Sequence, residues 1–234
     1  MFSVYIIHYR YEGKEKKIVF RSKELSCEEI EKKLSPFKIE RAIISTVRII
    51  PEFVTDLLTV NIPFVHKLSH NSRLPFKNEY ETPETLGTDR LAAVAGACFM
   101  FPGNDVLVID AGTALTFDFL AGGIYHGGNI SPGIRIRFKA LNKFTGKLPL
   151  VSPTEKFRSP GRNTMDAIIA GVVTGVIYEI NEYIRTFKEN HTDCNVVLTG
   201  GDSRFLRNKI NHKITYVPDI VMDGLNHILE YNAK

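Results

Sequence analysis

Residues 106–120 read VLVIDAGTALTFDFL, in which two apolar stretches flank an acidic residue, a glycine and a threonine. The apolar stretches predict two strands, at 106–110 and 115–120. A carboxylate at the end of a buried strand, such as that of Asp110, is costly unless it binds a cation or accepts hydrogen bonds. Gly112 allows backbone N–H groups and the Thr113 hydroxyl to approach a phosphate. The stretch therefore indicates a phosphate- or cation-binding turn, and the alternative is a tight β-turn built on Asp110.

A second junction of this kind is LTGGD, residues 198–202, which follows the apolar stretch at 195–198. Its two glycines, Gly200 and Gly201, would let a flat ligand such as adenine lie against the backbone. Taken alone, the same residues are also typical of a plain loop.

A third constellation is LGTDR, residues 86–90, at the predicted start of a helix over 87–100. Here Asp89 and Arg90 are adjacent where the helix dipole favours anions. Such a pair suits a general base beside an anion clamp. The alternative is an ordinary helix cap with a solvated arginine.

The rest of the chain alternates strand and helix patterns. Predicted strands lie at 2–11, 17–22, 41–45, 64–68 and beyond the turn at 122–123; predicted helices lie at 26–34, 51–58, 166–186 and 223–231; predicted loops lie at 70–83 and 127–133. Hairpins mixed with helices favour an α/β fold with a mixed sheet. The four-residue spacing of Gly171 and Gly175 predicts a close approach to the longest helix.

Composition excludes several classes of protein. The 234 residues are 44% hydrophobic and carry 30 basic against 26 acidic side chains, a net charge of +4. That balance excludes a disordered chain, and the scattered charges argue against a nucleic-acid partner. Three widely spaced cysteines, Cys27, Cys98 and Cys194, indicate neither a zinc site nor a disulfide framework. Because we find neither a membrane-spanning stretch nor a leader sequence, we expect a cytoplasmic protein without a membrane partner.

Taken together and in this order, the motifs resemble those of the type III pantothenate kinases, within the acetate kinase, sugar kinase and actin-like superfamily. The matching stretches are LGTDRLAAVAGA (86–97), VLVIDAGTALTFD (106–118), GGIYHGGNISPGI (122–134), KLPLV (147–151), GRNTMDAIIAGVVTG (161–175) and VVLTGGDS (196–203). The resemblance implies an α/β fold of two ribonuclease H-like (actin-like ATPase) halves, each a mixed sheet flanked by helices. We expect these halves at residues 1–104 and 105–234.

The activity implied by the resemblance is ATP-dependent phosphorylation of pantothenate to 4'-phosphopantothenate, the first step of coenzyme A biosynthesis. The implied cofactors are ATP, Mg²⁺ and a monovalent cation, K⁺ or NH₄⁺. A homodimer is also implied, and the sequence supports it only through the small-residue faces at 90–98 and 167–175.

The resemblance also implies a role for individual residues in the matching motifs. Asp89 is the expected general base that takes the hydroxyl proton. The expected pantothenate contacts are Tyr80, Gly87, Thr88, Asp89, Arg90 and Thr164, the last near the dimer interface. Thr113 and Gly112 are expected at the ATP phosphates, Gly200 and Gly201 beside adenine, and Asp110 at the monovalent cation.

One departure from the family pattern bears on activity. The family begins with a strand ending in D-x-G-N-T, the first phosphate-binding loop, and this sequence contains no such stretch. About a dozen residues are expected to be missing ahead of Met1. Either Met1 is an internal methionine of a longer, complete enzyme, which we favour for the natural protein, or the chain lacks this loop. For the 234-residue chain itself we predict weak or no kinase activity. The alternatives to an active pantothenate kinase are a degenerate kinase-like binding or regulatory protein and, less favoured, another sugar or acyl kinase.

Overall fold

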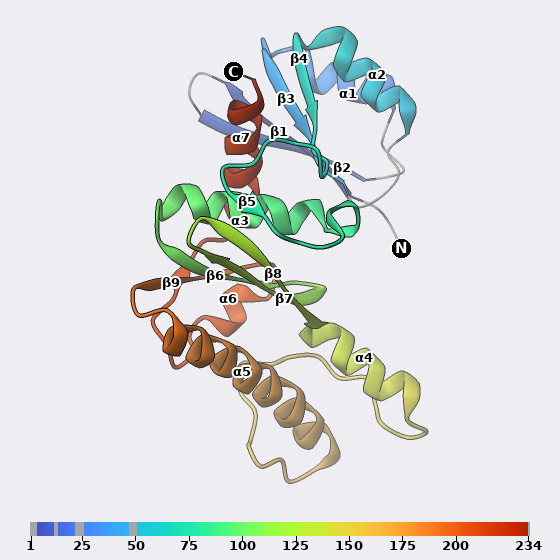
Figure 1. The fold of residues 1–234 in the computed structure, drawn as a ribbon. Helices are drawn as coiled ribbons and strands as arrows, with labels where there is room; N and C mark the ends of the chain where they lie inside the picture. Colours follow the sequence, from blue (N-terminus) through green and yellow to red (C-terminus); the bar gives the residue numbers. More distant parts are fainter. Residues whose placement is uncertain (1–3, 12–13, 22–25, 47–50, 234) are drawn as a thin grey trace. The chain divides into compact units, whose positions relative to one another are not determined.

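The computed structural model describes residues 4–11, 14–21, 26–46 and 51–233, the first two segments through their backbone alone (Figure 1). The chain divides into two compact units, neither of which is continuous in sequence. Unit 1 comprises residues 1–75, 82–96 and 221–234, and unit 2 comprises residues 76–81 and 97–220. The predicted division at residues 104 and 105 stays a prediction.

Unit 1 contains two separate pairs of strands. The antiparallel pair is β1 (Val4–Tyr11) with β2 (Lys14–Arg21), and the parallel pair is β3 (Arg41–Ile44) with β4 (Phe64–Lys67). The predicted strands at 2–11 and 17–22 are therefore present, although residues 2, 3 and 22 lie outside the described residues.

Two helices accompany the parallel pair, α1 (Cys27–Leu34) and α2 (Glu52–Asn61). Ser26 begins α1 as predicted, because its side chain accepts a hydrogen bond from the Glu29 backbone N–H at 3.2 Å. Apolar side chains of both helices, of β3 and of the residue after α2 form one core cluster, against which the partly buried Val65 of β4 packs: Ile30, Ala42, Ile44, Val54, Leu58 and Ile62.

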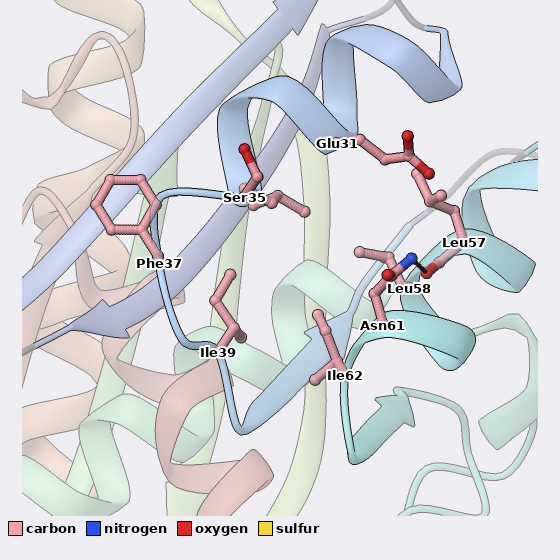
Figure 2. Close-up of a pocket in the computed structure, with 9 residues that line it drawn as sticks. Glu31, Ser35, Phe37, Ile39, Leu57, Leu58, Asn61 and Ile62 are labelled. Atoms are coloured by element: carbon pink, nitrogen blue, oxygen red, sulfur yellow. Dashed lines mark hydrogen bonds between the residues drawn. The ribbon is translucent and has the colours of Figure 1, made fainter.

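A cavity of about 460 Å³ lies between α1 and α2 (Figure 2). Most of its lining is apolar, and Glu31, Ser35 and Asn61 supply the polar groups; the other lining residues are Leu34, Phe37, Ile39, Leu57, Leu58 and Ile62. No residue singled out from the sequence lines this cavity.

The remaining helices of unit 1 pack at very close range. Unit 1 contains residues 88–96 of α3 (Thr88–Met100) and nearly all of α7 (Ile220–Asn232). A Cβ on Gly224 would overlap the Ala92 carbonyl oxygen and lie 2.8 Å from the Gly96 nitrogen. The small residues of α3 are thus buried against α7 of the same chain, so the expectation that the face at 90–98 supports a dimer is wrong.

Unit 2 contains a mixed sheet of six strands in the order β10-β9-β6-β7-β8-β5. Their bounds are Asp105–Ala111 for β6, Ala114–Ala121 for β7, Ile124–Pro132 for β8, Cys194–Thr199 for β9, Thr215–Tyr216 for β10 and Lys77–Asn78 for β5. Strand β6 is parallel to β9 and antiparallel to β7, which confirms the predicted α/β class with a mixed sheet.

Helices α4 (Ile134–Phe144), α5 (Thr164–Asn190) and α6 (Ser203–Leu206) contribute to the main core of unit 2. α5 is long and apolar enough to cross a membrane by length and composition alone. However, nine of its residues are buried, and eight of them belong to one core cluster with strand residues such as Leu107 and Phe117. It is therefore the core helix of this unit.

Two loops predicted in unit 2 and its surroundings are wrong. The predicted loop at 127–133 is mostly strand, because β8 continues through Gly127, whose φ of +99° accompanies a bulge opposite Phe119. The predicted loop at 70–83 contains β5 and begins a short 3₁₀ helix, Pro83–Thr85. The described chain itself makes no close approach to Gly171 or Gly175, since nothing lies within 4 Å of a Cβ built on either glycine, and the predicted close approach stays a prediction.

Candidate active site

The turn that the sequence predicts to bind phosphate or a cation follows β6 in unit 2, and the parallel strand β9 ends beside it. In the register of β6 with β9, Asp110 is paired with Thr199, so the turns after both strands meet at one edge of the sheet. Gly200 has a φ of +93°, and a Cβ there would collide with Asp110 Oδ1 and lie 2.6 Å from the Ala111 carbonyl group. The structure thus brings Asp110 and Gly200 into direct contact, as only a glycine permits.

A third segment completes this edge. The Gly133 N–H donates to the Thr113 carbonyl oxygen at 3.1 Å, and a Cβ on Gly133 would lie 2.6 Å from that oxygen. Gly133 is also the N-cap of α4, which places the start of that helix against the turn at residues 112–113. The N–H groups of a helix start favour anionic ligands. We call Asp110, Gly112, Thr113, Gly133 and Gly200 the nucleotide cradle.

Asp202 and Arg135 border the nucleotide cradle. The Asp202 N–H donates to the Ala111 carbonyl oxygen at 2.8 Å, and its carboxylate lies 3.5 Å from Arg135 Nε. Gly201 is exposed beside them, and a Cβ there would contact nothing within 4 Å. The sequence predicted neither Gly133 as a member of the cradle nor Arg135 and Asp202 as its neighbours. The motif stretches at 122–134 and 196–203 contain Gly133 and Asp202, but no pattern within them indicated this proximity.

The predicted general base and anion clamp, Asp89 and Arg90, lie in unit 1 at the start of α3. Asp89 is exposed, and its Oδ1 accepts a hydrogen bond from the Arg90 N–H at 2.9 Å. A Cβ on Gly87 would lie 2.5 Å from that same oxygen, so the carboxylate sits directly over the glycine. The Arg90 side chain is buried, with 7% exposure. An exposed carboxylate held by its own helix start is free to accept a proton from a ligand.

Thr88 is tied to the end of β3. Its hydroxyl accepts a hydrogen bond from the Ser45 hydroxyl at 2.9 Å and lies 3.5 Å from the Thr46 carbonyl oxygen. These contacts fix the first turn of α3 relative to the parallel strand pair within unit 1.

Tyr80 and Thr164 lie elsewhere in unit 2. Tyr80 follows β5, and its ring stacks on that of Tyr125 with a centroid distance of 6.2 Å. Thr164 is the first residue of α5, whose N-cap Asn163 accepts from the Asp166 N–H at 2.9 Å. Thr164 is exposed, as a residue that contacts a ligand must be.

The chain was compared with known proteins. A profile of the type III pantothenate kinase family matches residues 6–186. A type III pantothenate kinase of Phocaeicola vulgatus is 45% identical over 218 residues, which are 92% of this chain and 90% of that protein. One from Bacteroides fragilis is 44% identical over 217 residues, or 92% and 88%. Nothing in these matches supports a degenerate binding protein.

A solved structure also resembles this chain. It is a Campylobacter jejuni protein described as a Baf family transcriptional activator, with 25% identity, a TM-score of 0.58 and coverage of 94% of both chains. That likeness supports the fold over almost its whole length. With the profile match over most of the sequence and relatives at up to 45% identity, the chain belongs to the type III pantothenate kinase family of ATP-using kinases.

Proposed function

We propose that this chain transfers the γ-phosphoryl group of ATP to the hydroxyl of pantothenate, giving 4'-phosphopantothenate and ADP, with Asp89 as the general base. The observation that carries the proposal is the exposed Asp89 carboxylate, which lies over Gly87 at the start of α3. Phosphoryl transfer depends mostly on positioning and charge neutralisation, so one oriented carboxylate and a phosphate cradle supply what the protein must provide.

In the proposed reaction the pantothenate hydroxyl loses its proton to Asp89 as its oxygen forms a bond to the γ-phosphorus. The bond between that phosphorus and the β–γ bridging oxygen breaks, and ADP leaves. Gly87, Thr88, Arg90, Tyr80 and Thr164 bind pantothenate in this proposal.

The nucleotide cradle binds ATP in this proposal, with Gly112 and Thr113 at the phosphates and Gly200 and Gly201 beside adenine. The side of Gly200 on which a Cβ would stand is filled by Asp110 and the Ala111 carbonyl group, whereas nothing described lies within 4 Å of a Cβ on the exposed Gly201, so the open backbone surface for a ligand is at Gly201. The Gly112 N–H already donates to the Ala114 carbonyl oxygen, so Thr113 is the stronger candidate for the phosphate contact.

Two cations belong to the proposal. Asp110 fits a monovalent cation, because it offers a half-buried carboxylate at the end of β6, and oxygen ligands suit K⁺ or NH₄⁺. Among the described residues no group of three acidic, histidine or cysteine side chains could hold a metal ion. Mg²⁺ is proposed to bind with the ATP phosphates, as it commonly does in kinases. When bound, Mg²⁺ neutralises the phosphate charge.

A homodimer through α5 is also proposed. Gly171, Gly175 and Tyr178 are spaced by four and three residues and so share one face of the helix. Tyr178 is 69% exposed, and nothing described lies within 4 Å of a Cβ at either glycine. This face supports close approach by a second copy. We assign the enzyme to the cytoplasm, in agreement with its three free cysteines.

A coupled assay with ATP, pantothenate and K⁺ tests the proposal, run on this chain and on the chain extended upstream by its genomic codons. Turnover that D89N abolishes is the expected result, and mass spectrometry of the product identifies phosphopantothenate. Absence of turnover from both chains would overturn the kinase assignment, and light scattering tests the dimer.

A further inference from the structure

Unit 2 contains a buried carboxylate that the proposed reaction does not use. Asp118 lies in β7 with 1% exposure. The Tyr125 hydroxyl, itself in a fully buried residue, donates to Asp118 Oδ1 at 2.7 Å, and the Thr116 hydroxyl donates to Oδ2 at 3.3 Å. Burying a charge without partners costs several kcal/mol, and these two donors offset part of that cost.

Asp118 faces away from α5. The alternate residues of β7, Phe117 and Phe119, stack or pack against α5, with Phe117 only 3.8 Å from Tyr183 between ring centroids. Because successive side chains of a strand point to opposite faces, Asp118 and its Tyr125 partner belong to the other face of the sheet.

On that other face Tyr125 contacts the Tyr80 ring and binds the backbone of its neighbour Glu79. Their rings stack at 6.2 Å with an interplanar angle of 19°, and the Tyr125 carbonyl oxygen accepts from the Glu79 N–H at 3.1 Å. Gly127 lies against the Tyr80 ring, since a Cβ there would come within 3.2 Å of Tyr80 Cδ2. The Tyr80 N–H in turn donates to Asn78 Oδ1 at 3.0 Å. The ring and the backbone of Tyr80 are thus both fixed against β8.

From this chain of contacts we propose that Asp118 and Tyr125 are positioning residues that hold the Tyr80 ring in the orientation in which it binds substrate. The inference rests on the proposed function, in which Tyr80 contacts pantothenate. Neither Asp118 nor Tyr125 touches substrate, because both are buried. The hydrogen bond to the Asp118 carboxylate fixes the Tyr125 ring, and the Tyr80 ring stacks against the Tyr125 ring.

Steady-state kinetics of the extended chain test the proposal through Y125F, which keeps the ring and removes the hydroxyl. We expect KM for pantothenate to rise between about threefold and tenfold, the effect of losing one hydrogen bond. The values of kcat and of KM for ATP are expected to change less than twofold. D118N keeps an acceptor oxygen for Tyr125, so its KM for pantothenate is expected to rise less.

Y183F is the matched control. It removes the hydroxyl of a tyrosine of α5, whose ring packs on the opposite face of the same sheet. Its kinetics are expected to equal those of the unsubstituted chain. A KM for pantothenate in Y125F that is unchanged, or that rises no more than KM for ATP, would overturn the positioning role.

A second measurement needs no substrate and separates this inference from the proposed function. The chain has nine tyrosines, and ¹⁹F NMR of protein labelled with 3-fluorotyrosine can assign the Tyr80 signal by its loss in Y80F. We expect D118N and Y125F to shift or broaden that signal and Y183F to leave it unchanged. A changed signal in a protein that never phosphorylates pantothenate would refute the proposed function while supporting the positioning of Tyr80. An unchanged signal in both variants would refute the positioning itself.

Discussion

Replacing Gly200 with alanine is the sharpest test of the nucleotide cradle. Two separate costs follow from the structure. The φ of +93° lies in the left-handed region, which costs an alanine about 1–2 kcal/mol. The new Cβ would also collide with Asp110 Oδ1 and lie 2.6 Å from the Ala111 carbonyl group, and such overpacking costs about 1–3 kcal/mol. The free energy of unfolding is therefore expected to fall by about 2–5 kcal/mol.

Gly103 offers a matched control in the same unit. Its φ is +78°, yet a Cβ there would meet nothing within 4 Å. G103A thus carries the backbone cost without the collision, and it is expected to lose only about 1–2 kcal/mol. The difference between the two variants isolates the contact between the turn after β9 and the turn after β6.

The assay is urea unfolding followed by circular dichroism, with KM for ATP measured in parallel. We expect KM for ATP to rise at least tenfold in G200A, since the collision must displace Asp110 or the Ala111 backbone, and to stay unchanged in G103A. The reasoning is refuted if the two variants lose the same stability, or if G200A binds ATP as the unsubstituted chain does.

Three further predictions follow from individual side chains. D89N in the extended chain is expected to lower kcat by about 10²–10⁴-fold, the usual contribution of a general base, with pantothenate binding measured by calorimetry changed only a few-fold. G224A is expected to lower the urea midpoint markedly, because its Cβ would overlap the Ala92 carbonyl oxygen; an unchanged midpoint would contradict this packing of α7 on α3. Burial raises the pKa of Asp105, but hydrogen bonds from the Gly122 N–H and the His191 ring outweigh it and hold the pKa below its usual value. A carboxylate with a lowered pKa stabilises the fold above its usual pKa of about 3.9, so stability is expected to fall as the pH drops below that value, and D105N should reduce this dependence in acid titrations of unfolding.

The sequence predicted the elements whose patterns are local. Four features occur near their predicted positions: the strands at 106–110 and 195–198, the cap at Ser26 and the long helix after residue 163. The spacing of apolar residues and the capping side chain both depend on residues that are close together in the sequence. The glycine-rich stretch at 127–133 misled the prediction, since its strand character comes from pairing with β7 rather than from propensity.

The candidate site was predictable in part for the same reason. Asp110 and Gly200 each stand beside a recognisable strand end, but their mutual contact follows from the parallel pairing of β6 with β9. The roles of Asp118 and Tyr125 could not be read from the sequence at all. A lone acidic residue inside an alternating strand pattern is normally solvent-facing, and only the fold shows that it is buried with a tyrosine hydroxyl.

The two sets of proposed site residues differ in how the fold supports them. The nucleotide cradle extends from β6 and β9, which each have a partner strand on both sides, and residues 106–109 of β6 are fully buried. The start of α3 is tied through Thr88 to the end of β3, which among the described residues pairs only with β4. Two-stranded sheets are marginally stable, because few ladder hydrogen bonds hold them and both edges are open. A substitution that weakens the pairing of β3 with β4 is therefore expected to disturb the position of Asp89, whereas the cradle extends from strands that are paired on both sides.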